Sequence, residues 1–362
     1  MYLTLRRVSV VALAVFSGGL LAAPAEEPSL RVTDPMMRPA LISPRAARAT
    51  LLDVALAGKR LVAVGERGIV LLSDDNGANW HQAPVPVSVT LTVVRFADEA
   101  RGWAAGHNGV LLRTTDGGES WERILDGGDV VRLYQHQADQ LAAASGEEVE
   151  RVKRARRQAN LLASDGPDKP WLDLNIDAAG RLWLVGAYGL VLRSRDGLDW
   201  EAWSTHLDNP GELHLYAMRS QGEEIVIAGE QGLLLRSEDG GESFKRLQSP
   251  YKGSYFVLEL HEGQILVAGL RGNAFLSTDH GEHFKPVALP APISVTASVQ
   301  RSDGVTVLAD QAGNLYQMAQ QELVVLAASA GPGPSALVED EGGALVSVGR
   351  LGPQVISLPT RP

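Results

Sequence analysis

Hydrophobic residues along this chain gather in short runs that turn-forming residues separate. In segment 61–72, LVAVGERGIVLL, two such runs flank a Gly-x-x-Gly sequence, which is typical of two strands joined by a tight turn. The same arrangement recurs in segments 310–313 and 349–352, where the repeat is less regular. The first glycine of the regular turns is at Gly65, Gly106, Gly186, Gly229 and Gly269. One repeat takes about 40 residues, apart from a single interval about twice as long, which predicts a β-propeller.

A second pattern, Ser/Thr-x-Asp-x-Gly-x-x-Trp/Phe, follows each of the five regular turns, and we call it the box. Its hydroxyl and carboxylate can accept backbone N–H bonds across a hairpin, while its glycine takes a positive φ. Its aromatic residue is expected to pack against the neighbouring repeat. We therefore expect the box residues to be structural. They are Asp75 and Trp80, Asp116 and Trp121, Asp239 and Phe244, Asp279 and Phe284, and, in a copy shortened by one residue, Asp196 and Trp200.

Seven repeats predict an all-β fold, a seven-bladed β-propeller that forms one domain over residues 50–358. Residues 134–162 fall in the long interval and are rich in Ala, Glu, Gln, Lys and Arg, without the alternation of a strand. We expect a helical insertion there, at about 134–165, between blades two and three. The last repeat lacks an outer strand, so we expect the N-terminal segment 26–49 to complete blade seven. The alternative is a three-stranded last blade with a loose N-terminus.

Residues 1–25 have the three parts of a secretory signal peptide. Arg6 and Arg7 precede an apolar run at 8–23, and a small-residue cleavage site follows. The run is shorter than the roughly 20 residues that a spanning helix needs, and an uncleaved anchor is the alternative. The absence of cysteine excludes disulfides, a thiol active site and a lipoprotein anchor. We expect a secreted protein, located in the periplasm and monomeric.

The chain is acidic, with 33 basic and 43 acidic residues and a formal net charge of −10. This balance argues against nucleic acid as a partner. One segment of the insertion opposes the trend. We expect this basic segment to bind an acidic protein surface, or to make peripheral membrane contact through anionic lipid headgroups. The alternative is a solvated helix face whose charge is balanced by neighbouring glutamates. Its basic residues are Arg151, Lys153, Arg154, Arg156 and Arg157.

With both patterns laid out, the chain resembles the Asp-box, or BNR-repeat, propellers. More narrowly, it is similar to the photosystem II stability and assembly factor family. Segment 102–121, GWAAGHNGVLLRTTDGGESW, carries the resemblance best, and the likeness extends over about residues 50–358. The resemblance implies a seven-bladed, non-catalytic assembly factor that binds membrane-protein intermediates. It also implies a family member that acts in the bacterial envelope. The shortened box in the third repeat and the missing boxes in the last two depart from the pattern.

The Gly-x-x-Gly turns and the boxes should lie on opposite faces of such a ring, because they join opposite ends of the third strand. The two residues between the glycines differ from repeat to repeat, while the flanking glycines and strands stay the same. Such variation on a constant scaffold is expected of a binding face. Arginines lead our candidates for contact with a protein partner, because a guanidinium pairs bidentately with carboxylates. The candidates are Arg67, His107, Tyr188, Glu230, Arg271 and Arg350.

An alternative function is a secreted glycoside hydrolase of the sialidase type. Such an enzyme needs three arginines, a tyrosine nucleophile and a glutamate, and the turns supply those residue types. A lectin is a further alternative, but it would need aromatic platforms, and only Tyr188 occupies a suitable turn position. Segment 279–283, DHGEH, contains metal-ligand types within a box turn, and we expect it to bind no metal. We expect no cofactor.

Overall fold

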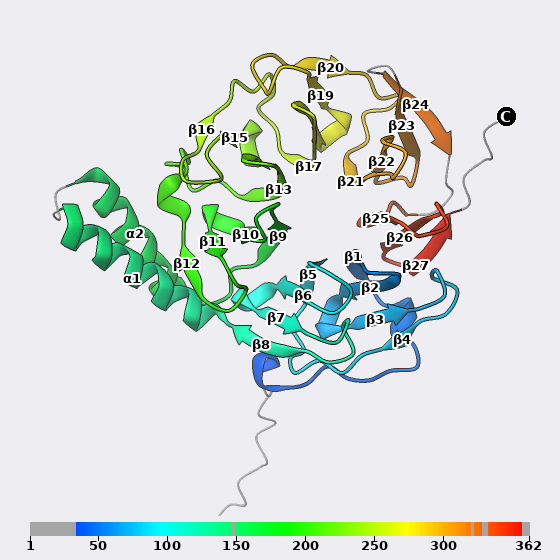
Figure 1. Ribbon diagram of the computed structural model, residues 1–362, viewed down its shortest axis with the longest axis horizontal. Coiled ribbons are helices and arrows are strands. Elements are labelled where there is room, and N and C mark those ends of the chain that lie inside the picture. Colours follow the sequence, from blue (N-terminus) through cyan, green and yellow to red (C-terminus); the bar gives the residue numbers. More distant parts are fainter. Residues whose placement is uncertain (1–33, 146–148, 320–321, 328–331, 357–362) are drawn as a thin grey trace, which may run out of the picture. The chain divides into compact units, whose positions relative to one another are not determined.

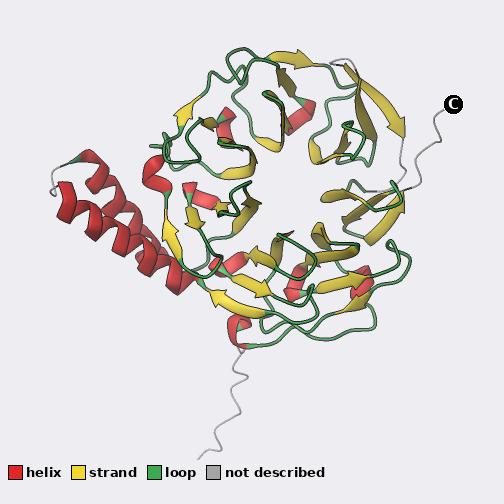
Figure 2. Cartoon of the chain, viewed as in Figure 1, coloured by secondary structure: helices red, strands yellow, loops and turns green. Residues whose placement is uncertain are grey.

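In the computed structural model, seven antiparallel sheets surround a central axis, as Figure 1 shows. The structure describes residues 34–145, 149–319, 322–327 and 332–356. Six of the sheets have four strands and the last has three. Loops and turns connect the strands, and one pair of helices projects from the ring beside blade three (Figure 2). The predicted seven-bladed β-propeller with a helical insertion between blades two and three is confirmed.

The strands follow the chain from blade to blade, innermost strand first. Blades one and two consist of β1 (Leu51–Ala57), β2 (Arg60–Gly65), β3 (Val70–Ser73), β4 (His81–Gln82), β5 (Leu91–Phe96), β6 (Gly102–Gly106), β7 (Leu111–Thr114) and β8 (Glu122–Leu125). Blades three and four consist of β9 (Trp171–Ile176), β10 (Leu182–Gly186), β11 (Val191–Ser194), β12 (Trp200–Ala202), β13 (Leu215–Gln221), β14 (Glu224–Gly229), β15 (Leu234–Ser237) and β16 (Lys245–Arg246).

The remaining blades continue this order. They consist of β17 (Tyr255–His261), β18 (Gln264–Gly269), β19 (Ala274–Ser277), β20 (Lys285–Val287), β21 (Val295–Gln300), β22 (Thr306–Asp310), β23 (Leu315–Ala319), β24 (Glu322–Ala327), β25 (Ala336–Glu339), β26 (Leu345–Gly349) and β27 (Gly352–Ile356). The second strands are buried almost throughout, and their aliphatic side chains pack between adjacent blades. The hydrophobic core is therefore a circle of interfaces between sheets.

Each box forms the turn from the third to the fourth strand of its blade. In blade four, Ser237 Oγ accepts the Gly241 N–H at 2.8 Å, and Asp239 Oδ1 accepts the Ser243 N–H at 2.9 Å. Gly241 has a φ of 88°, and a Cβ there would lie 2.3 Å from the Trp183 ring of blade three. The box therefore also fits against the preceding blade. The expected hydrogen bonds and positive φ are confirmed.

The shortened box of blade three keeps both of these bonds with one residue fewer. Ser194 Oγ accepts the Gly197 N–H at 2.8 Å, and Asp196 Oδ1 accepts the Asp199 N–H at 2.9 Å. In the full-length boxes the aspartate reaches the residue four positions later, whereas here it reaches the third. The hydroxyl and carboxylate thus define the turn, and its length can vary.

The box aspartates should make the stability of the ring depend on pH below about 4. Partial burial works against ionisation, yet hydrogen bonds from Ser243 and Ser237 lower the pKa of Asp239 to about 2. A carboxyl with a lower pKa in the folded state adds stability above its unfolded pKa of about 3.9, and this stability is lost as the pH falls toward 2. We expect Asp239→Asn to weaken that dependence, measured as urea midpoints at pH 7, 4 and 3. An unchanged pH dependence in the variant would contradict this role of the carboxylate.

The insertion is a hairpin of two helices, α1 (Gly127–Ser145) and α2 (Glu150–Asp165). It begins earlier than the predicted residue 134, because Asp126 Oδ1 accepts the Gly128 and Asp129 N–H groups and caps the helix. Tyr134 is buried and holds α1 to the ring, accepting the Val191 N–H at 2.8 Å. Among the described residues, neither helix is apolar enough over a sufficient length to cross a membrane.

The N-terminal segment does not complete blade seven within the described residues. Residues 34–49 contain two short 3-10 helices, η1 (Pro35–Met37) and η2 (Ala46–Arg48), and no strand. This segment lies along blade one, where the Ala40 N–H donates to the Val85 carbonyl at 2.9 Å, and η2 packs against β27. For residues 34–49 the predicted closure is wrong, because these backbone bonds already engage the segment, and it is not loose either. Residues 1–33, including the predicted signal peptide, lie outside the described residues.

Candidate functional site

The five regular Gly-x-x-Gly turns share one geometry on the face opposite the boxes. Each is a short 3-10 turn between the second and third strands, and its second inner residue has a φ between 53° and 58°. These residues are Arg67, Asn108, Tyr188, Gln231 and Arg271. A side chain at this position projects from the same backbone frame in every blade. The turns therefore form a ring of variable residues, which we call the turn face.

Three arginines of the turn face are exposed and available to a partner. Arg67 of blade one and Arg271 of blade five occupy the left-handed position of their turns. Arg350 of blade seven lies in a different, two-residue hairpin in which Gly349 pairs with Gly352. Within the described part of the chain, none of the three guanidinium groups makes a hydrogen bond or an ion pair. Their charges are therefore free to meet carboxylates of another protein.

Glu230, in contrast, is committed to its own blade. It is half-buried, and its Oε2 accepts the His214 N–H at 3.3 Å and lies 3.8 Å from His214 Nε2. Glu66 occupies the same position in blade one and accepts the Thr50 N–H at 3.0 Å. Both glutamates thus fasten the start of the innermost strand of their own blade. Glu230 therefore has a structural role within its own blade, and its contact with a partner stays a prediction.

His107 and Tyr188 are both exposed on the turn face near the root of the insertion. The Lys169 ammonium lies 5.3 Å from the centroid of the Tyr188 ring, and the Tyr188 carbonyl accepts from Gln158 of α2 at 3.3 Å. Tyr188 is thus fixed by the insertion, while 49% of its surface stays exposed. The three arginines, Tyr188 and Glu230, which supply the residue types that a sialidase needs, lie on five different blades.

The basic residues of α2 bind mainly to this protein itself. Arg157 pairs with Glu212 at 2.5 Å, and Arg154 donates to the Thr205 carbonyl at 3.4 Å. Arg151 contacts the Thr205 hydroxyl at 3.3 Å. The other two pair within the hairpin, Arg156 with Asp139 and Lys153 with Glu150. Three of the five basic residues therefore hold α2 against the loop between blades three and four. The charge pattern of the segment did not predict this internal role.

The hairpin begins and ends at the turn face but lies beside blade three, not over the axis (Figure 1). Gly109 of the second turn donates its N–H to the Lys169 carbonyl at 3.0 Å, which places the root of the insertion at that face. Hydrophobic residues of both helices then pack with Trp171, Leu190 and Trp200 of blade three. Only the root of the insertion therefore shares the turn face, and the helices themselves pack against the side of blade three.

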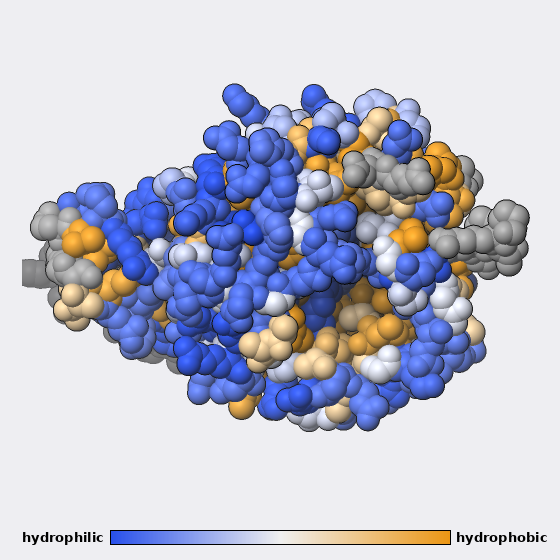
Figure 3. All heavy atoms as spheres, turned by 45° about the horizontal axis from the view of Figure 1, so that its top comes forward, coloured by the Kyte–Doolittle hydropathy of each residue, from blue (hydrophilic) through white to orange (hydrophobic). Residues whose placement is uncertain are grey.

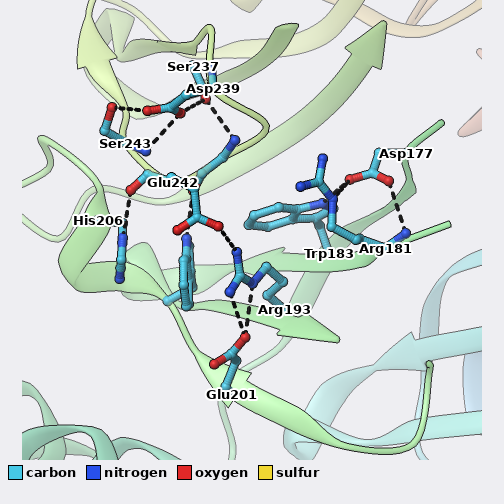
Figure 4. Close-up of polar contacts among 12 residues, drawn as sticks. Asp177, Arg181, Trp183, Arg193, Glu201, His206, Ser237, Asp239, Glu242 and Ser243 are labelled. Atoms are coloured by element: carbon cyan, nitrogen blue, oxygen red, sulfur yellow. Dashed lines mark hydrogen bonds and ion pairs between the residues drawn. The ribbon is translucent and has the colours of Figure 1, made fainter. Parts of the chain in front are cut away.

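A buried arginine joins blades three and four on the box side (Figure 4). Arg193 donates to Glu201 Oε1 at 2.8 and 3.0 Å and to Glu242 Oε1 at 2.7 Å. Its guanidinium carbon lies 3.3 Å from the centroid of the Trp203 ring, a cation–π contact. Trp203 Nε1 in turn donates to the Gly241 carbonyl at 2.7 Å. This cluster fixes the box of blade four to blade three, so we assign it a structural role.

A belt of alternating carboxylates and guanidiniums runs along the axis over four of the seven blades and was missed by the sequence analysis. Arg95 donates to Asp53 at 2.5 Å and to Asp173 at 3.1 Å, and Arg219 donates to Asp173 at 2.8 Å. One residue comes from the innermost strand of each of blades one to four. Burial opposes the charge of Arg95, but the carboxylates of Asp53 and Asp173 outweigh it and raise the pKa of the guanidinium. Burial also raises the pKa of the Asp53 carboxyl, because desolvation outweighs the Arg95 guanidinium and the Val94 N–H, so of this pair Arg95 holds its charge more firmly.

The two aspartates of the belt also bind backbone groups of the next blade. Asp53 Oδ2 accepts the Val94 N–H at 2.9 Å, and Asp173 Oδ2 accepts the Met218 N–H at 2.9 Å. Sequence offers one signal for them, because each interrupts an apolar inner strand at its third residue, in LLDVALA and WLDLNI. The belt lines an axial cavity of ≈ 520 Å³ that residues of all seven inner strands enclose.

Comparison with known proteins identifies the family. Residues 45–130 and 162–324 match the family described as Photosynthesis system II assembly factor YCF48. The chain belongs to this family. The match leaves out residues 131–161, which form most of the helical hairpin. The suspected family is thereby confirmed.

Two curated proteins resemble short stretches of the chain. The chloroplastic photosystem II stability/assembly factor HCF136 of Cyanidioschyzon merolae is 38% identical over 81 residues, 21% of this chain and 18% of that protein. The photosystem II assembly lipoprotein Ycf48 of Synechococcus sp. (strain CC9902) is 33% identical over 66 residues, 17% of this chain and 20% of that protein. The matched stretches thus span a fifth or less of the length of these relatives.

Among solved structures, YCF48 bound to D1 peptide has the same fold. It superposes with a TM-score of 0.61 at 17% identity and covers 86% of this chain and 94% of that chain. At this identity the likeness concerns the fold alone.

Within the described residues, no three His, Cys, Asp or Glu side chains gather as metal ligands would. In segment 279–283, His283 instead contacts Asp279 at 2.8 Å.

Proposed function

We propose that this chain is a non-catalytic assembly factor that binds an acidic segment of a membrane-protein complex at its turn face. Membership of the YCF48 family supports the class of function, and the curated relatives are photosystem II assembly proteins. The observation that carries the proposed site is the set of exposed, unpaired guanidinium groups of Arg67, Arg271 and Arg350. Each group can pair with a carboxylate through two parallel hydrogen bonds.

The binding would be an equilibrium that holds a client until a later subunit takes its place. No covalent step is needed, because a ring of loops on a rigid sheet frame can present fixed charges without rearrangement. The client we propose is a membrane protein complex or its assembly intermediate, by analogy with the D1 peptide that YCF48 carries in its solved structure. The genes that neighbour this one would indicate which complex it is.

Replacing Arg67, Arg271 and Arg350 together with alanine should reduce capture of the client from detergent-solubilised membranes at least about tenfold. The estimate follows from hydrogen bonds to charged groups, each of which contributes about 1.5–3 kcal/mol. A triple Arg→Lys variant should recover part of the binding, because it keeps the charge and loses the planar fork.

Gln231→Ala, at the same turn position in blade four, is the matched control and should bind normally. Thermal unfolding of the alanine variant should equal that of the wild type, because the three exposed side chains make no hydrogen bond or ion pair within the described residues. Undiminished capture by a folded triple variant would refute the proposed site.

We also propose that residues 1–25 direct export and that the propeller acts in the periplasm. The proposal rests on the basic start, the apolar run at 8–23 and the small-residue site after it. Fusion of residues 1–25 to alkaline phosphatase, which is active only after export, should give phosphatase activity in intact bacteria. Val15→Arg, which interrupts the apolar run, should abolish it. An inactive wild-type fusion would contradict export.

A further inference from the structure

Four aromatic rings form a continuous row on the turn face, from blade three to the axial opening. The centroids of Tyr188 and His214 are 4.9 Å apart, those of His214 and Tyr216 are 6.2 Å apart, and those of Tyr216 and Phe256 are 5.3 Å apart. The planes of His214 and Tyr216 are nearly parallel, at 8°. All four side chains are partly exposed. The row is therefore a surface on which another chain can lie.

The inner end of this row belongs to the axial cavity. Tyr216 and Phe256 are the second residues of β13 and β17, and both line the cavity of ≈ 520 Å³. The inner strands start at the turn face, so these two rings lie at the cavity mouth on that side. Figure 3 shows the molecule hollowed near its centre, with hydrophilic and hydrophobic residues side by side at the border of the hollow.

The charges that line the cavity do not balance. Its lining contains three carboxylates, of Asp53, Asp173 and Glu259, and two guanidiniums, of Arg95 and Arg219. The belt described above pairs both guanidiniums with Asp53 and Asp173. Glu259 makes one side-chain hydrogen bond, accepting from Ser298, and forms no ion pair within the described residues. Glu259 is therefore the one carboxylate of this lining without an ion pair in the described part of the chain, and its charge reaches Arg95 only at longer range.

We propose that the aromatic row and the axial cavity together bind an extended, basic segment of a protein partner. The segment would lie along Tyr188, His214 and Tyr216 and insert a lysine or arginine side chain past Phe256 toward Glu259. Aromatic faces attract such a cation before it reaches the carboxylate. The proposal rests on the proposed function only in taking a protein as the partner, and it does not involve Arg67, Arg271 or Arg350.

The spacing and the charge of the site favour this occupant. Side chains on one face of an extended peptide repeat at about 6.6 Å, close to the steps between the rings. An acidic segment would suit the arginines of the turn face, but in the cavity it would meet an unpaired carboxylate. The chain also carries a formal net charge of −10, which favours approach of a basic segment.

The test is a selection of random peptides from a phage-displayed library on the wild-type propeller, with prior depletion on Glu259→Gln. This variant keeps an acceptor for Ser298 and removes only the charge. We expect enrichment of peptides with a lysine or arginine next to apolar or aromatic residues. A synthetic copy of the selected peptide should bind Glu259→Gln and Tyr216→Ala at least tenfold more weakly, with unchanged thermal unfolding of both variants.

Two controls separate this proposal from the proposed function. Arg67→Ala/Arg271→Ala/Arg350→Ala should bind the selected peptide as the wild type does, and replacement of its basic residue by norleucine should abolish binding. Absence of enrichment, enriched peptides without a basic residue, or equal affinity for Glu259→Gln would overturn the proposal. Binding of array glycans that is lost in Tyr216→Ala, without any peptide binding, would overturn it in favour of a sugar site.

Discussion

Replacing Asp173 with alanine should destabilise the propeller by about 3–5 kcal/mol, the usual effect of removing one partner from a buried ion pair. Its carboxylate bridges Arg95 of blade two and Arg219 of blade four and accepts the Met218 and Leu174 N–H groups at 2.9 Å. The variant leaves charges and backbone donors without partners at the axis. Urea denaturation followed by circular dichroism measures the loss.

The matched control is Asp208→Ala, which removes an exposed aspartate without side-chain bonds in the described part of the chain. Exposed substitutions of this kind change stability by about 0.5 kcal/mol or less. Asp173→Asn keeps an acceptor but loses the charge, so it should fall between the two. Equal stability of Asp173→Ala and Asp208→Ala would show that the belt does not hold the ring together.

Replacing Tyr134 with alanine should cost about 3–5 kcal/mol and release the helical hairpin from the ring, since large buried aromatic residues lose this much on truncation. The ring of Tyr134 packs between α1 and blade three. Its hydroxyl accepts the Val191 N–H at 2.8 Å and donates to the Val191 carbonyl at 3.1 Å. Proteolysis of residues 127–165 in the folded variant, together with urea denaturation, measures both effects.

Tyr134→Phe isolates the contribution of the hydroxyl. It keeps the packing and leaves the Val191 N–H without its partner, which costs about 1–3 kcal/mol. The hairpin of this variant should stay resistant to protease. If Tyr134→Ala unfolds with the wild-type midpoint, the hairpin contributes nothing to the stability of the ring.

The fold was predictable because the signals that specify each blade are local. The box needs a hydroxyl, a carboxylate, a glycine and an aromatic residue within eight positions, as in Ser237 to Phe244, and the bonds that shape the turn, from its hydroxyl and carboxylate, close within it. The Gly-x-x-Gly turns are equally local. Blade count and insertion follow from the spacing alone.

Features that depend on docking between distant segments were not predictable in the same way. The partners of Arg154 and Arg157 lie in the loop at 203–214, roughly 50 residues away along the chain, and only the seating of α2 brings them together. The axial belt likewise joins Asp53, Arg95 and Asp173 across three blades. We predicted the N-terminal segment in blade seven because the last blade would otherwise expose the edge of its sheet. Residues 34–49 instead make backbone hydrogen bonds to the chain that follows β4 of blade one.

The candidate binding face was predicted in outline and changed in detail. The turns placed Arg67 and Arg271 on one frame, as the common left-handed position confirms. Glu230 could not be recognised as structural, because its partner is the backbone of His214, sixteen residues earlier. The aromatic row was missed for the same reason: Tyr216 and Phe256 are on inner strands, and the packing of blades three, four and five brings them into line with Tyr188.

The central claim, that a partner binds the turn face and not the box face, can be tested by site-specific photo-cross-linking. The chain has no cysteine, so single substitutions accept a benzophenone maleimide at one site each. Asn108→Cys and Gln231→Cys place the probe on the turn face, and Asn76→Cys and Glu282→Cys place it on the box face. With solubilised membranes of the source organism, we expect cross-links to the same membrane protein from the first pair and none from the second. Cross-links from the box-face probes alone would contradict it.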